Sequence, residues 1–124
     1  DLQYIPPIDQ IDPSNTKYRD SILASYQQHM GKAPIASKSF DRFYTAQLLW
    51  DETMAERIAN FVKQQPDYRV VVLAGRAHVI YGYGIPDRVR RRMGQSKFTQ
   101  KTVLLSDEGD QKPPQPADFI WSKD

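Results

Sequence analysis

The sequence predicts an α/β fold: a few-stranded, mostly parallel sheet covered by helices, with one long central helix. Two observations predict it. Helical spacing of apolar residues persists from Ser39 to about Gln65, and Pro66 then ends the helix. The β-branched run Arg69–Ala74 follows, too short for an ordinary helix and typical of a strand buried on both faces. So few strands leave a sheet edge uncovered, and we therefore expect the chain to be part of a larger α/β domain.

Composition narrows the possible functions. The 124 residues suffice for one domain, and a formal charge of +2 is too small to indicate nucleic acid or an acidic membrane surface. Without cysteine there can be no disulfide, cysteine zinc site or thiol catalysis, so a metal or haem would need His, Tyr, Met or carboxylate ligands. No apolar run approaches the ~20 residues that cross a bilayer. The missing initiator Met predicts a processed or truncated chain.

The N-terminal third begins with an irregular lead-in, Asp1–Ser14, which contains three prolines and no periodicity. Ser14 or Asn15 can cap a helix that we expect over Lys17–Met30. Gly31 follows that helix and favours its end.

The long helix carries polar residues on its apolar face. Gln47 and Asp51 are four residues apart and therefore stack, one turn after Tyr44, whereas Glu52 falls on the opposite, polar face. A buried carboxylate costs several kcal/mol unless it is paired. One interpretation is a structural polar network that ties the helix to the buried strand. The other is that Asp51 orients His78 while a tyrosine approaches a ligand.

The stretch Val70–Arg92 gathers the residue types best suited to chemistry. The predicted strand ends at Gly75, and His78 follows three residues later, at the carboxyl end of the strand where ligands bind in open α/β sheets. A Tyr-Gly-Tyr-Gly loop then holds Tyr81 and Tyr83, and we expect its two glycines to supply positive φ.

A short helix is predicted from Pro86 to Met93, with Gly94 as its stop. It carries four arginines, which suit either an anionic ligand or a solvated helix face. They are Arg88, Arg90, Arg91 and Arg92.

Two further strands are predicted near the C-terminus. Lys101–Ser106 is apolar enough to be buried, and Ala117–Trp121 alternates like a short edge strand. Between them, Asp107–Pro116 is rich in proline and predicts a loop.

Two segments, YTAQLLWDETMAERIANFV and LAGRAHVIYGYGIPDRV, resemble the C-terminal half of the ChaN-like haem-binding proteins, which are grouped with Tiki and erythromycin-esterase proteins. The resemblance covers roughly Phe40–Val89. Gly75-Arg76-Ala77-His78 matches the second of two motifs of that superfamily, and the first has no counterpart before Gly75. The chain is therefore expected to be a single domain over residues 1–124 or a C-terminal fragment of a ChaN-like domain.

The resemblance implies a bacterial haem-binding protein that acts in haem or iron uptake or handling. It also implies a homodimer. The protein is expected in the periplasm, or anchored to a membrane through a segment outside this chain. The resemblance implies iron ligation by a tyrosine or by His78, with Tyr44 preferred over Tyr81. Arg88, Arg91 or Arg92 would hold the propionates, and the aromatic wall would consist of Tyr44, Trp50, Tyr81 and Tyr83. The implied cofactor-binding residues are Tyr44, Gln47, Asp51, Gly75, His78, Tyr81, Tyr83 and Arg91, with Tyr44 and His78 as metal ligands.

Two other functions fit the same residues. In a metal-dependent hydrolase of the Tiki or esterase kind, His78 would be a metal ligand or general base oriented by Asp51. In an interaction module, Arg88–Arg92, Lys97 and Lys101 would form a basic patch for an acidic partner, although without the interleaved aromatic residues that nucleic acid favours. Binding is the stronger prediction than catalysis.

Overall fold

The computed structural model describes residues 5–30, 37–105 and 115–122. Helices dominate these ranges, and a small sheet accompanies them. The elements are the helices α1 (Thr16–Met30), α2 (Ser37–Gln64) and α3 (Ile85–Met93), the short 3₁₀ turns Ile8–Gln10, Arg76–His78 and Ile80–Gly82, and the strands β1 (Val103–Leu105) and β2 (Phe119–Trp121).

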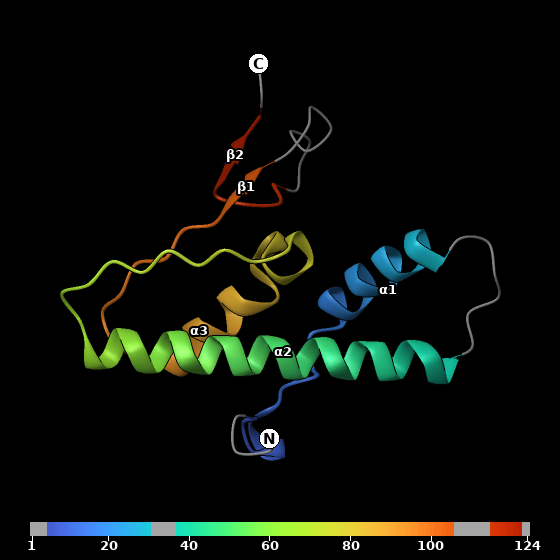
Figure 1. Ribbon diagram of the computed structural model, residues 1–124, viewed down its shortest axis with the longest axis horizontal. Helices are drawn as coiled ribbons and strands as arrows, with labels where there is room; N and C mark the ends of the chain where they lie inside the picture. The colour runs from blue at the N-terminus through green and yellow to red at the C-terminus, as the bar shows by residue number, and fades with distance from the viewer. Residues whose placement is uncertain (1–4, 31–36, 106–114, 123–124) are drawn as a thin grey trace.

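The long helix α2 is the axis of the molecule (Figure 1). One apolar cluster joins α1 to the first half of α2, and a second joins α3 to its second half. The prediction of a long central helix is therefore confirmed, with its start two residues earlier than expected. The first cluster contains Tyr18, Ile22, Phe40, Tyr44 and Leu48, and the second contains Ala55, Ala59, Ile85, Val89 and Met93.

The predicted ends of α1 and α3 are largely confirmed. Asn15 caps α1, because its Oδ1 accepts a hydrogen bond from the backbone N–H of Tyr18 at 2.9 Å. Gly94 ends α3 with a positive φ of 58°, and its N–H bonds the carbonyls of Arg90 and Arg91. The segment that follows α1, residues 31–36, lies outside the described residues.

The sheet consists of β1 and β2, which pair in parallel with Leu104 opposite Ile120. Leu104 is buried, whereas Leu105 and Trp121 are exposed. Both C-terminal strands thus form, shorter than predicted. The prediction that the strand within Lys101–Ser106 is buried is wrong for Val103 and Leu105, which are exposed because helices do not cover this small sheet. Most of the predicted loop Asp107–Pro116 lies outside the described residues.

The prediction of a buried strand at Arg69–Ala74 is wrong. The segment runs back along α2 as a lone extended chain (Figure 1). Its residues Val71 and Leu73 are 85% and 93% exposed. A strand needs a neighbour for its backbone hydrogen bonds, and no such bond to Val70–Leu73 is found among the residues that the structure describes.

Candidate functional site

The G-x-x-H segment forms the 3₁₀ turn Arg76–His78, which brings His78 against α2, and a second 3₁₀ turn, Ile80–Gly82, follows it. The backbone N–H of His78 bonds the carbonyl of Gly75 at 3.0 Å. Tyr81 then adopts a positive φ of 56°, rare for a residue with a side chain. Its N–H is held by the carbonyl of Pro116 at 2.6 Å, which ties this turn to the segment before β2.

His78 contacts Asp51, as the sequence predicted. His78 Nδ1 lies 2.6 Å from Asp51 Oδ1, and Asp51 is fully buried. Because a carboxylate accepts hydrogen bonds, the contact places the imidazole proton on Nδ1 and leaves a lone pair on Nε2. The His78 side chain is 21% exposed, and no described residue bonds Nε2. This is the arrangement of a histidine ready to bind a metal or accept a proton.

Tyr18, which the sequence did not indicate as a site residue, completes the environment of Asp51. Its hydroxyl donates to Asp51 Oδ2, and its side chain is fully buried. Burial, then the negative charge of Asp51, raises the pKa of Tyr18, so its hydroxyl stays a proton donor. Gln47 Nε2 donates to the Tyr18 hydroxyl at 3.2 Å and lies 3.0 Å from His78 Nδ1. A buried Asp51 requires donors, and that requirement was the signal that could have found Tyr18.

Gly84 allows the loop to approach α2 closely. A Cβ at this position would lie 2.3 Å from the carbonyl oxygen of His78 and 3.1 Å from Asp51 Oδ2. Its φ is −81°, so the predicted positive φ is found at Gly82 alone of the loop's two glycines. Gly84 is therefore required for space.

The predicted tyrosines differ in accessibility. Tyr44 is buried in the first apolar cluster, and its hydroxyl has no hydrogen-bond partner among the described residues. Burial raises the pKa of Tyr44. The rings of Tyr81 and Tyr83 lie 5.5 Å apart between centroids, with Tyr81 exposed and Tyr83 packed against the first apolar cluster. The structure thus places Tyr81, and not Tyr44, where a ligand could reach it.

Three of the four arginines of α3 converge on Glu52. Glu52 was predicted on the polar face, opposite the apolar one, but its side chain is fully buried. Arg88 Nε lies 3.1 Å from Oε1, Arg92 donates to Oε2 at 2.9 Å, and Arg91 also donates to Oε1. The spacing of these arginines on one face of α3 was the signal for a shared partner.

The same cluster fixes the N-terminal segment. The N–H of Asp12 donates to Glu52 Oε1 at 3.2 Å, Arg88 donates to the Asp12 carbonyl, and Arg91 donates to the Gln10 carbonyl. The Arg88 guanidinium also lies 5.2 Å from the centroid of the Tyr18 ring. The Glu52 and Asp51 networks are therefore in contact through Arg88 and Tyr18.

The described part of the chain has neither a metal-ligand cluster nor a membrane-spanning helix. It contains no group of three or more His, Cys, Asp or Glu side chains that could hold a metal ion. None of its helices is long and apolar enough to cross a membrane.

Comparison with known proteins identifies the family of the chain. Residues 1–89 match the family described as "Haem-binding uptake, Tiki superfamily, ChaN". The match therefore begins well before Phe40, where the resemblance in the sequence begins. No curated protein and no solved structure shows a significant match.

Proposed function

The chain belongs to the ChaN family of haem-binding uptake proteins in the Tiki superfamily, and we propose that it binds haem through His78 in the uptake or handling of haem iron. The contact of His78 Nδ1 with the buried Asp51 carboxylate carries the proposal. Histidines that ligate metals usually donate their second N–H to such a carboxylate, which fixes the ring and the tautomer.

The donor set fits haem. Haem supplies four nitrogen ligands to its own iron, so the protein needs to contribute only one or two axial ligands. His78 Nε2 is a single, partly exposed donor of this kind. The absence of a three-ligand cluster among the described residues is compatible with such a site.

The surroundings of His78 suit an apolar ring. Tyr81 is exposed and paired with Tyr83, and Trp50, 66% exposed, lies three residues after Gln47 on the same side of α2. These aromatic side chains are the proposed wall for the macrocycle.

Exposure and position separate the arginines as partners of the propionates. Arg88 is buried, and Arg91 and Arg92 bond Glu52. Arg76 is exposed and lies two residues before His78, and this position makes it our proposed propionate partner. Arg91, which is 39% exposed, is the alternative.

Haemin titration followed by the Soret absorbance tests the proposal. We expect saturable binding to the wild type, loss of the ligand-specific Soret position in His78→Ala, and no change in His29→Ala, the matched control at the other histidine. Tyr81→Phe should weaken binding without changing the ligand, and Tyr44→Phe should leave the Soret position unchanged. A titration without saturation in the wild type would refute the proposal, and loss of the band in Tyr44→Phe alone would move the ligand to Tyr44.

The Asp51–His78 contact also favours a second candidate, a hydrolase in which His78 is the general base. Turnover of an activated ester such as p-nitrophenyl acetate, lost in His78→Ala and kept in His29→Ala, would support it. Equal background rates in all three proteins would eliminate it.

A homodimer with haem between the subunits is a further part of the proposal. Light scattering after gel filtration, with and without haemin, tests it. A haemin-dependent doubling of mass is expected, and an unchanged monomer would contradict it.

A further inference from the structure

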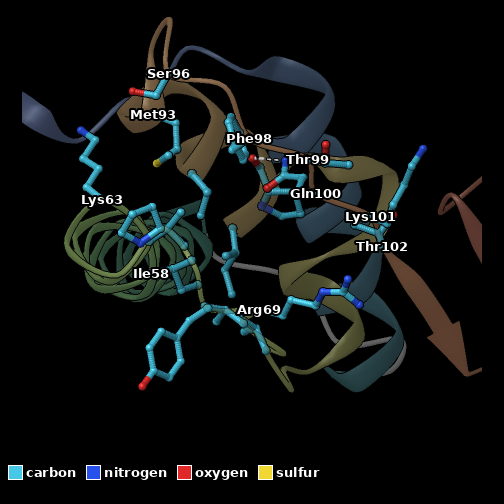
Figure 2. A pocket seen from close by; sticks show the side chains of 18 of the residues that line it. Ile58, Lys63, Arg69, Met93, Ser96, Phe98, Thr99, Gln100, Lys101 and Thr102 are labelled. Atoms are coloured by element: carbon cyan, nitrogen blue, oxygen red, sulfur yellow. Dashed lines mark hydrogen bonds between the residues drawn. The ribbon is translucent and has the colours of Figure 1, made fainter.

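A groove of about 980 Å³ lies on the side of α3 and of the second half of α2. Figure 2 shows its lining, with Ile58 and Lys63 on one side and Phe98 to Thr102 on the other. Its volume is at the upper end of the range for ligand sites in proteins. His78, Asp51 and Gln47 are not among its lining residues, so it is distinct from the proposed haem site.

One wall of the groove is an extended chain with strand-like alternation. Val70 and Val72 line the groove and are 39% and 42% exposed, whereas the alternate residues Val71 and Leu73 face away and are largely exposed. This period of two is that of a β-strand. The backbone groups of Val70–Leu73 nevertheless make no hydrogen bond within the described residues.

The opposite wall is the chain that leads into β1. Thr99, Gln100 and Lys101 line the groove, and no backbone hydrogen bond to any of them is found in the ranges that the structure covers. Further on, the Thr102 carbonyl bonds β2 through the N–H of Phe119. Two unpaired extended segments thus border one groove, and such edges are templates for an added strand.

The floor of the groove is apolar and comes from two helices. Ile58 and Val62 of α2 and Ile85, Val89 and Met93 of α3 form it. Side chains at alternate positions of an added strand would point at this floor, as they do where a sheet packs on helices.

The rim of the groove is cationic. Its lining includes Lys63, Arg69, Lys97 and Lys101 and no acidic residue. Lys101 is paired with Asp118 and Lys63 with the Arg92 carbonyl, but Arg69 and Lys97 have no partner within the described chain. Two unpaired cations beside an apolar floor complement an occupant with acidic flanks.

We propose that this groove binds a partner polypeptide in an extended conformation, with apolar residues at alternate positions and acidic residues at its ends. The occupant adds a β-strand against Val70–Leu73 and the segment before β1, packs its apolar side chains on α2 and α3, and pairs its acidic ends with Arg69 and Lys97. Main-chain hydrogen bonds provide affinity, and the floor and rim provide selectivity.

Fluorescence anisotropy with a labelled peptide, Glu-Val-Thr-Val-Thr-Val-Glu, tests the proposal on the whole chain. The peptide should bind with saturation, at least about tenfold tighter than Lys-Val-Thr-Val-Thr-Val-Lys or than the same acidic peptide with a central proline. Arg69→Glu with Lys97→Glu should weaken it by about tenfold or more. The matched control, Lys17→Glu with Lys38→Glu, changes the net charge equally at exposed positions of other segments and should bind like the wild type.

Amide hydrogen exchange reports where the peptide binds. The amides of Val70–Leu73 and of Thr99–Lys101 should exchange quickly in the free protein and become protected with the peptide. His78→Ala should keep both effects, because the groove does not include the haem site. Equal binding of the three peptides, or binding without this protection, would overturn the proposal. Protection that rises with protein concentration alone would overturn it in favour of a second copy of the chain.

Discussion

His78 and Tyr18 bind opposite oxygens of one buried carboxylate, that of Asp51. His78 comes from the loop after Gly75 and Tyr18 from α1, so Asp51 joins three parts of the chain at a single point. A buried carboxylate is costly unless donors satisfy it. The two hydrogen bonds satisfy Asp51, and the one from His78 uses Nδ1 and leaves Nε2 without a hydrogen bond within the described residues.

Tyr18→Phe should change the hydrogen bond of His78 through Asp51, although Tyr18 and His78 share no hydrogen bond. The change removes the donor to Asp51 Oδ2 and should lower the free energy of unfolding by about 1–3 kcal/mol. The freed carboxylate should then bind His78 Nδ1–H more strongly and shift its proton resonance downfield. NMR can follow this signal with His29 as an internal reference, since the chain has two histidines.

The control for this prediction is Tyr26→Phe, which removes an exposed hydroxyl that donates to Ser39. Its free energy of unfolding should stay within about 0.5 kcal/mol of the wild type. An unchanged His78 resonance in Tyr18→Phe would show that Tyr18 does not act on the histidine.

Gly84→Ala should be destabilising, whereas Gly75→Ala should not. A methyl group at Gly84 would meet the His78 carbonyl oxygen at 2.3 Å, and the backbone must move, at a cost of about 1–3 kcal/mol. At Gly75, where φ is −61°, a methyl group would lie 3.6 Å from His78 Cδ2, an ordinary contact. Denaturant unfolding of both variants checks the difference, and equal stability would contradict it.

Glu52→Gln should be among the most destabilising single changes in the chain. It leaves Arg91 and the buried Arg88 without their anion and leaves Arg92 with Glu56, which should cost about 3–5 kcal/mol of unfolding free energy. Glu56→Gln is the matched control, because Glu56 is partly exposed and its ion pair with Arg92, at 3.6 Å, is its single ion pair within the described residues. It should cost at most about 1 kcal/mol. Comparable losses from both changes would argue against a central role for Glu52.

The sheet should loosen in strong acid. The backbone N–H of Thr102, followed by the hydrogen bonds of Lys101 and of the Thr102 hydroxyl, lowers the pKa of Asp118 from 3.8 to about 2. The charged carboxylate therefore stabilises the fold fully above about pH 4, and this contribution is lost as the pH falls through about 2. NMR titration of Asp118, with exchange of the Phe119 amide as the readout of strand pairing, checks this; a titration midpoint near 4 would contradict it.

Local patterns predicted the helices and the central contact of the site. Apolar spacing located α2 and placed Asp51 on its buried face, and the G-x-x-H segment placed His78 where that carboxylate could meet it. These inferences need only helix geometry and short loops, and both depend on residues that are close together in the sequence.

Non-local features were not predictable in this way. Arg69–Ala74 has the composition of a strand, but pairing depends on a neighbour that composition cannot supply. Glu52 follows Asp51 by one step of about 100° and lies at the border of the apolar face, where only the position of α3 decides whether it is buried. The haem ligand, the homodimer and the compartment stay predictions.

Resonance Raman spectroscopy of the haem complex, reduced to the ferrous state, detects the iron–histidine stretching vibration itself and so shows directly whether His78 binds the iron. We expect this band in the wild type and in His29→Ala, a lower frequency in Asp51→Asn, where the neutral amide replaces the carboxylate at Nδ1, and no band in His78→Ala. A complex that forms with the wild type but shows no iron–histidine band, or keeps the band in His78→Ala, would contradict the assignment of His78 as the haem ligand.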